Sequence, residues 1–358
     1  MTSAYRYHRQ TILKGFGEEG QQKLTAAKVL VIGAGGLGIP VLTYLNAMGV
    51  GTLGIVDKDH IALSNLHRQV LYTENMVGQS KAEFAKKQLE SQNSNTQIVA
   101  YKTFLDTSNA LEIISNYDVV VDATDNFPTR YLINDACILL KKPFVYGALH
   151  GFEGQVSVFN YENGPTYRCL FPTMPKADEV PNCNEHGVLG ILPGIVGNLQ
   201  ALETIKVITG IGAVLSGSLL LYDGLKQHFQ KMKFELNPKN LTITDLMHSY
   251  AFDCEVQGKT MAAANITDLL KDNTISFLDV RTTAEYAENH LKNSTNIPLD
   301  ELAVKAQDLN LSQVTYLICQ SGIRSQKAAI VLQELFPEKD FIQVEGGMNK
   351  IDTYANTH

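Results

Sequence analysis

The fold of the first part of this chain is decided by residues 29–38, which read VLVIGAGGLG. The apolar run VLVI is typical of a strand that is buried on both faces, and the glycines that follow it predict a tight turn. From Leu37 to Met48 the apolar residues recur at helical spacing, and residues 52–56 predict a second buried strand. We therefore expect a strand, a glycine turn, a helix and a second strand in that order.

The sequence contains no charged residue from Val29 to Val56, and a run of this length can cross a membrane. Glycines interrupt the run at positions 33, 35, 36, 38, 49, 51 and 54. Glycines at that density are typical of turns between buried elements. Residues 1–10, MTSAYRYHRQ, are polar and lack the apolar core of a signal peptide. We therefore expect neither a signal peptide nor a membrane partner.

The alternation of strands and helices continues along the chain. The pattern predicts a helix at 81–91, a strand at 118–121, a helix at 129–140 and a strand at 143–146. Such alternation predicts an α/β fold with a doubly wound, Rossmann-like, mostly parallel sheet. Beyond Gly151 the pattern favours an antiparallel extension, with strands at 155–159 and 219–222 and an apolar helix at 194–209.

Length and composition limit the classes of protein that fit. The chain has 358 residues, of which 44% are hydrophobic and 19% are charged, and its net charge is −7. At about 150 residues per domain this length predicts two or three domains, each able to bury its own core. The negative charge is spread along the chain, which argues against a nucleic-acid partner. The chain has five cysteines and no C-x-x-C pair, which argues against a disulfide framework and favours a cytoplasmic location.

The chain is predicted to contain two domains. We expect the first to span residues 1–245 and a polar linker to span residues 246–261. The second domain, residues 262–358, repeats the alternation on a smaller scale, with strands that include 276–280 and 316–319. It is therefore predicted to be a small α/β domain.

The glycine turn is a candidate nucleotide site. Gly33, Gly35 and Gly38 satisfy G-x-G-x-x-G between a strand and a helix, and Gly36 stands within the pattern. Glycines let the backbone approach a phosphate, and the helix N-terminus presents free N–H groups to it. Asp57 ends the second strand and is placed to bind a ribose. By itself the motif indicates only a nucleotide, for which an NAD-dependent oxidoreductase is the commonest interpretation.

Two cations that follow Asp57 favour a triphosphate over a dinucleotide. Arg68 lies in SNLHRQ, residues 64–69, and Lys81 lies in VGQSK, which ends at that residue. In-line attack at a phosphorus needs cations around its oxygens, together with a metal ion. Asp125, which follows a buried strand, is the candidate Mg²⁺ ligand.

In this order the motifs closely resemble the MoeB/ThiF family, the prokaryotic relatives of ubiquitin-activating enzymes. The resemblance covers roughly residues 5–237. It rests on RYHRQ at 6–10, the glycine turn, GIVD at 54–57, SNLHRQ at 64–69, GQSK at 78–81, TDN at 124–126 with Arg130, EGQV at 153–156 and GVLG at 187–190.

The resemblance implies that ATP and Mg²⁺ are used to adenylate the C-terminal glycine of a ubiquitin-like sulfur-carrier protein that ends in Gly-Gly. It implies that Gly36 lines the phosphate loop, that Asp57 binds the ribose and that Asp125 positions magnesium. The nucleotide contacts that it implies further along the chain are Ser64, Asn65, Arg68, Gln69, Lys81 and Asn126. Arg9 resembles an arginine that reaches into the partner subunit's site, which implies a homodimer.

The cysteines depart from the family pattern. Many members hold a structural zinc with two C-x-x-C pairs. Here Cys169 matches one ligand, Thr166 stands where its partner would be, and the second pair would fall near Asn240 and Ile243. One thiolate cannot form a four-ligand zinc site, so we expect no zinc.

Cys183 lies in the polar segment VPNCNE, residues 180–185. It matches a cysteine with which some relatives link covalently to the carrier, whereas other relatives do not need it. A catalytic cysteine and a loop cysteine without chemical duty both stay open. Cys254 has no assignment.

The second domain contains a candidate sulfur site, CQSGIRS at residues 319–325. Between a strand and a helix, Cys319 is expected to face backbone N–H groups and Arg324, which favour a thiolate and a bound persulfide. The loop resembles the C-x-x-G-x-R loop of rhodanese-type sulfurtransferases over roughly residues 262–352. Supporting matches are LDVR at 278–281, Glu285, Tyr286, His290, IPL at 297–299 and EGG at 345–347. Phosphatases that share the fold have a longer loop, so sulfur transfer is favoured.

The two resemblances together predict an adenylyltransferase fused to a sulfurtransferase, similar to molybdopterin-synthase adenylyltransferases with a rhodanese tail. The nearest alternative is an activator of the thiamine pathway. An NAD-dependent oxidoreductase leaves Arg68, Lys81 and the sulfur loop unexplained, and a non-catalytic scaffold does not need them. The carrier, its pathway and the sulfur donor are not assigned by the sequence.

Overall fold

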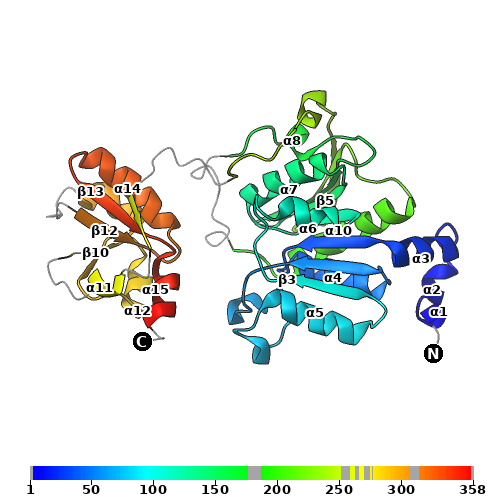
Figure 1. Cartoon of the computed structure of the whole chain (residues 1–358), viewed down its shortest axis with the longest axis horizontal. Coiled ribbons are helices and arrows are strands. Elements are labelled where there is room, and N and C mark those ends of the chain that lie inside the picture. The colour runs from blue at the N-terminus through cyan, green and yellow to red at the C-terminus, as the bar shows by residue number, and fades with distance from the viewer. Residues whose placement is uncertain are drawn as a thin grey trace. The chain divides into compact units, whose positions relative to one another are not determined.

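The computed structural model of this chain describes residues 3–175, 187–250, 259–262, 266–269, 275, 277–306 and 314–355. The chain divides into two compact units, Met1–Asp253 and Cys254–His358. Among the described residues, the first unit contains an eight-stranded sheet and the second a five-stranded sheet (Figure 1).

The sheet of the first unit has the strand order β3-β2-β1-β4-β5-β6-β7-β8. Its strands are β1 (Lys28–Ile32), β2 (Thr52–Val56), β3 (Gln97–Tyr101), β4 (Val119–Asp122), β5 (Phe144–His150), β6 (Glu153–Phe159), β7 (Ser218–Asp223) and β8 (His228–Lys233). The strands from β3 to β5 pair in parallel, and β6, β7 and β8 continue the sheet antiparallel. The predicted fold class is confirmed. Because the connections change direction between β1 and β4, the crevice for a ligand lies at their carboxyl ends.

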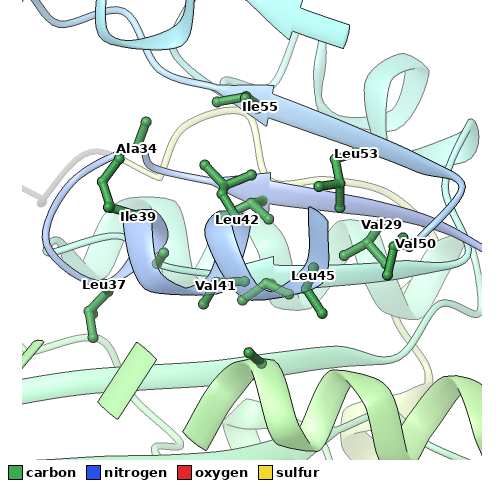
Figure 2. Packing of buried hydrophobic residues seen from close by; sticks show 14 of the residues in the cluster. Val29, Ala34, Leu37, Ile39, Val41, Leu42, Leu45, Val50, Leu53 and Ile55 are labelled. Atoms are coloured by element: carbon green, nitrogen blue, oxygen red, sulfur yellow. The ribbon is translucent and has the colours of Figure 1, made fainter. Parts of the chain in front are cut away.

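The uncharged stretch from Val29 to Val56 forms the centre of this unit. β1 is buried except at Lys28, and helix α4 (Gly38–Ala47) packs on it. Figure 2 shows the side chains of β1, α4 and β2 meeting in one apolar cluster, which includes Leu42 and Leu53. The expected strand, helix and strand are confirmed, and this stretch does not span a membrane as one helix.

Helix α10 (Ile191–Thr209) is the one helix of the described residues that is long and apolar enough to cross a membrane. Half of its apolar window is buried in the unit, where it packs against α4, β5 and β6. Gln200 on this helix is fully buried and donates to the carbonyl of Asp122 at 2.7 Å. Glu203 is buried as well and accepts from the backbone N–H of Leu215 at 2.8 Å. These polar contacts inside the unit identify α10 as a core helix.

The structure describes further helices in the first unit, which pack on the sheet or on one another. They are α1 (Ser3–Arg6), α2 (His8–Thr11), α3 (Gly17–Ala26), α5 (Lys81–Gln92), α6 (Ala110–Ser115), α7 (Phe127–Leu139), α8 (Tyr167–Leu170) and the 3₁₀ turns η1 (Leu63–Asn65), η2 (Glu74–Met76) and η3 (Pro238–Leu241). Tyr250 is buried and donates to Asp135 Oδ2 at 2.7 Å, so the chain remains attached to α7 up to that residue.

The second unit has a parallel sheet in the order β11-β10-β12-β13-β9. Its strands are β9 (Lys259–Met261), β10 (Phe277–Asp279), β11 (Ser294–Asn296), β12 (Val314–Ile318) and β13 (Asp340–Val344). Its helices are α11 (Ile266–Leu269), α12 (Thr283–Glu288), α13 (Leu299–Lys305), α14 (Ile323–Leu335) and α15 (Gly347–Ala355). Two apolar clusters form its core, and Leu317 and Ile318 of the central strand β12 belong to different ones. This unit is the predicted small α/β domain.

Candidate functional site

The glycine turn closes tightly onto the end of β1. Gly33 has φ +101°, a conformation that residues with a side chain rarely adopt. A Cβ at Gly38 would lie 1.8 Å from the Gly33 carbonyl oxygen, so a glycine is needed for α4 to begin here. The turn brings the backbone N–H of Ala34 to 2.7 Å from Asp57 Oδ2. The carboxylate at the end of β2 is thus fixed beside the turn.

Asp57 is held between two backbone donors, because its Oδ1 also accepts from the N–H of Asp59 at 2.8 Å. Burial raises the pKa of Asp57, and the hydrogen bond from Ala34 and the charge of Lys81 oppose that rise. An open cavity of about 660 Å³ adjoins it, a volume in the range of small-molecule sites. The cavity is lined by Lys58, Asp59, His60, Lys102, Thr103, Phe104 and Asp106.

Lys81 begins α5 and lies beside the same turn. Only 6% of the residue is exposed, and its Nζ lies 3.0 Å from Asp59 Oδ2. The hydroxyl of Tyr72 lies 3.0 Å from the carbonyl oxygen of Ala34 and 3.2 Å from that of Lys81, which joins the start of α5 to the turn. The sequence analysis assigned no role to Asp59 or Tyr72. The sequence DKD at residues 57–59 places a second aspartate close to Asp57, and this pattern could have indicated Asp59 as a site residue.

The SNLHRQ segment packs against the glycine turn. Arg68 donates from Nη1 to the carbonyl of Ser64 at 3.1 Å, and a Cβ at Gly36 would lie 3.4 Å from Arg68 Cδ. Asn65 Oδ1 accepts at 3.2 Å from the backbone N–H of Ala62, the residue that precedes η1. Gln69 is buried, and its Nε2 would lie 3.7 Å from a Cβ at Gly35. The structure therefore brings these predicted site residues to one side of the turn.

The loop after β4 lies against the glycine turn, since a Cβ at Gly33 would be 2.7 Å from the Ala123 carbonyl oxygen, and it presents Asp125 in an exposed position. Asp122, by contrast, is buried and accepts from the backbone N–H and the hydroxyl of Thr124 at 3.0 and 2.6 Å. Asn126 caps α7 by accepting from the N–H of Thr129 at 2.9 Å, so its side chain has a structural task. Asp125 is thus the carboxylate of this loop that is open to a ligand.

The residues around the glycine turn could hold Mg²⁺ only if a bound phosphate supplied further ligands. No group of three His, Cys, Asp or Glu side chains that could hold a metal ion occurs in the part of the chain that the structure describes. Mg²⁺ is commonly bound by one or two carboxylates, with phosphate oxygens and water completing its shell. A single exposed Asp125 beside a phosphate-binding turn matches that pattern.

Two predicted site residues of the first unit are not part of the arrangement described so far. Arg9 is exposed on α2, a helix that packs on α3. Cys183 lies outside the described residues, so the structure does not place it.

Cys169 lies where the family would hold zinc, and its neighbours are hydrogen-bond donors. Its Sγ lies 3.4 Å from both the N–H and the hydroxyl of Thr166, 3.3 Å from the N–H of Asn237 and 3.4 Å from Nδ2 of Asn240. Burial acts to raise the pKa of Cys169, but these hydrogen bonds outweigh it and lower the pKa. N–H groups cannot ligate a metal, so these residues do not fit zinc. The sulfur instead joins α8 to η3.

The sulfur loop of the second unit encloses Cys319, which follows β12 and is fully buried. Its Sγ accepts from the N–H of Gly322 at 3.1 Å and lies 3.6 Å from the hydroxyl of Ser325. Gly322 has φ +93°, and a Cβ at Gly347 would lie 2.0 Å from the Cys319 carbonyl oxygen. Glycines at both positions therefore allow the loop to curl around the sulfur.

Arg324 was expected to face Cys319, and the charges of the two side chains are close enough to interact; its guanidinium is in addition held by Glu285. Nη1 donates to Oε2 at 2.7 Å and Nη2 donates to Oε1 at 2.6 Å. These hydrogen bonds are the main cause that lowers the pKa of Glu285 to about 2. The buried Arg281 is paired likewise with Asp279 at 2.8 Å, so these two residues shape the site.

Comparison with known proteins identifies both units. The ThiF family model matches residues 7–243, and the rhodanese-like domain model matches residues 262–353. A sulfur carrier protein adenylyltransferase of Thermus thermophilus is 54% identical over 239 residues, which cover 65% of this chain and 88% of that protein. The adenylyltransferase and sulfurtransferase MOCS3 of Aedes aegypti is 41% identical over 370 residues, covering 93% of this chain and 82% of that protein.

Solved structures support the fold. Escherichia coli MccB superposes with a TM-score of 0.59 at 21% identity, over 69% of this chain and 74% of that one. PaaA superposes with a TM-score of 0.56 at 22% identity, over 66% of this chain and 76% of that one. With the matches along the sequence, these comparisons lead to one conclusion. The chain belongs to the ThiF family, among those members that join an adenylyltransferase and a sulfurtransferase in one polypeptide.

Proposed function

We propose that this chain uses ATP and Mg²⁺ to adenylate the C-terminal glycine of a ubiquitin-like sulfur-carrier protein, and then supplies the sulfur that converts it to a thiocarboxylate. The observation that carries the proposal is the convergence of Asp57, Arg68 and Lys81 on one glycine turn, at the strand edge where the connections change direction. The same chain carries a cysteine loop of the rhodanese type.

In the adenylation step the carrier carboxylate attacks the α-phosphorus of ATP and pyrophosphate leaves. Asp57 holds the ribose, and the cavity next to it receives the base. Arg68 and Lys81 neutralise charge on the phosphate oxygens, and Asp125 would hold the Mg²⁺ that supplies further positive charge there. The protein forms no covalent bond in this step, so positioning and charge stabilisation provide the catalysis.

In the sulfur step a persulfide on Cys319 attacks the acyl carbon and AMP leaves. The product is an acyl disulfide between the carrier and Cys319. A thiol of an external dithiol reductant then attacks the Cys319 sulfur, which releases the thiocarboxylate, and the second thiol of the reductant reduces the mixed disulfide left on Cys319. Cys183 stays a candidate for a covalent link to the carrier.

The carrier is proposed to be of the molybdopterin-synthase type, with the thiamine pathway as the alternative. Support comes from the relatives, which are named MOCS3 and sulfur carrier protein adenylyltransferase. We further propose a cytoplasmic homodimer in which Arg9 serves the partner subunit's site, since Arg9 is exposed on α2. Sedimentation of the purified chain as a monomer would contradict the dimer, and recovery of the chain outside the cytoplasmic fraction would contradict the location.

The adenylation proposal is tested by isotope exchange between ATP and pyrophosphate. We expect exchange with a carrier that ends in Gly-Gly and none with the same carrier shortened by its last glycine, because the attacking carboxylate is then misplaced. Exchange of equal rate without any carrier would refute the proposal.

The metal content is a separate prediction. Purified protein is expected to contain no stoichiometric zinc, because the neighbours of Cys169 are N–H and hydroxyl groups. Elemental analysis of the protein after dialysis against chelator checks this. One tightly held zinc per chain would show that the site was wrongly interpreted.

A further inference from the structure

The residues that surround Cys319 carry almost no net charge. The loop residues 320–323, QSGI, are neutral. Arg281 forms a buried ion pair with Asp279, and Arg324 forms a two-bonded ion pair with Glu285. Each arginine beside the sulfur therefore has its own carboxylate.

Glu285 is well suited to keep Arg324 neutralised. It lies in the first turn of α12, where its carboxylate also accepts from the N–H and the hydroxyl of Thr282 at 3.0 and 2.8 Å. Hydrogen bonds from Arg324, followed by those from Thr282, lower the pKa of Glu285 to about 2, so it stays ionised at neutral pH. Four contacts from two elements hold the carboxylate in place. Arg324 itself remains about one quarter exposed in its side chain, so a ligand can reach it.

We propose that Glu285 is a specificity-determining residue of the sulfur site, which neutralises Arg324 and thereby disfavours doubly charged sulfur donors relative to persulfides. The inference rests on the proposed sulfurtransferase function of this loop. The charges of Cys319 and Arg324 are close enough to interact. Both Glu285 and Cys319 raise the pKa of Arg324, and the hydrogen bonds to Glu285 have the larger effect. An unpaired guanidinium there would attract an anionic donor, whereas a paired one does so weakly.

The two classes of donor differ in the charge that the site must accept. With a persulfide R–S–SH, the Cys319 thiolate attacks the outer sulfur, the S–S bond breaks, and the leaving R–S⁻ takes up the proton to give R–SH. With thiosulfate, the thiolate attacks the outer sulfur and sulfite leaves with both negative charges. The second reaction brings a dianion against a thiolate, so it depends more on a free cation.

The test is the Glu285→Gln variant of the full chain. Glutamine at this helix position preserves the capping interaction with Thr282, so the substitution removes the charge without removing the cap. The rate of persulfide formation on Cys319 is measured by mass, once with thiosulfate and once with 2-mercaptoethanol persulfide, which carries no charge beyond that of the persulfide group, as donor. We expect the ratio of the two efficiencies to shift toward thiosulfate about tenfold, through a lower KM for thiosulfate. That KM should also become dependent on salt, since screening weakens a newly exposed charge.

Two further variants separate charge from structure. Glu301→Gln removes a carboxylate from the Glu301–Lys305 pair within α13, and it is expected to leave the donor ratio unchanged. Adding Arg324→Gln to Glu285→Gln should abolish the gain for thiosulfate, because the freed cation is then absent.

The possible outcomes are distinct. An unchanged donor ratio in Glu285→Gln, or a gain that persists when Arg324 is also replaced, would overturn the inference. Wild-type protein that loads Cys319 from neither donor would instead refute the proposed sulfurtransferase function. A gain for thiosulfate that salt suppresses would support the role of Glu285.

Discussion

Replacing Lys81 by alanine is expected to lower carrier-dependent ATP–pyrophosphate exchange by about 10²–10³-fold, the usual cost of removing one charge-stabilising contact from a transition state. Lys81 is buried to all but 6% beside the glycine turn, so its ammonium group is held in a fixed position there. Its present ion-pair partner Asp59 has a side chain that is 59% exposed, and it can be solvated when Lys81 is lost. The loss of exchange should therefore exceed any loss of stability.

Lys86→Ala is the matched control for this experiment. Lys86 lies one turn further along α5, is exposed, and pairs with Glu90 on the same helix. Exchange should be unchanged in that variant, because exposed pairs within a helix contribute little. Asp125→Ala is expected to show a loss similar to that of Lys81→Ala. Full exchange in both Lys81→Ala and Asp125→Ala would show that the nucleotide site is elsewhere.

Replacing Cys319 by alanine is expected to abolish thiocarboxylate formation while leaving ATP–pyrophosphate exchange nearly unchanged. Without the sulfur there is no atom to carry the persulfide, whereas the predicted adenylation residues all belong to the other unit. The wild-type chain should gain the mass of one sulfur atom on incubation with a persulfide donor, and the variant should not. Thiocarboxylate is measured by mass on the carrier, with purified enzyme and no added sulfurtransferase.

Cys169→Ser provides the control for a general loss of thiols, since serine keeps an acceptor for the donors around position 169. We expect it to form thiocarboxylate at the wild-type rate. Cys183→Ala then tells whether a second cysteine takes part: persulfide should still form on Cys319, and a covalent intermediate between the carrier and residue 183 should be lost, whereas thiocarboxylate still forms if Cys183 has no chemical role. A normal rate of thiocarboxylate formation in Cys319→Ala would refute the sulfur role of the second unit.

The sequence predicted β1, β2, β4 and β5 of the parallel part of the sheet, because these four strands are short apolar runs that are largely buried. Residues 29–32 and 52–56 are apolar runs of this kind, and they form the paired strands β1 and β2. The sequence analysis missed β3 and β8, the two edges of the sheet. β8 reads HFQKMK and is exposed at every position, so it contains no apolar run and is defined by its pairing with β7.

For the site, the sequence by itself determined the residue types and their order, because the motifs are local: GAGGLG, SNLHRQ, GQSK and CQSGIRS each occupy a few consecutive residues. Only the tertiary structure decided which of these residues meet. It pairs Lys81 with Asp59, Cys169 with Asn237, and Arg324 with Glu285. The partners in these three pairs are 22, 68 and 39 residues apart along the chain. Contacts over such separations depend on how helices and loops pack on a sheet, and neither side-chain spacing nor propensity in one segment contains that information.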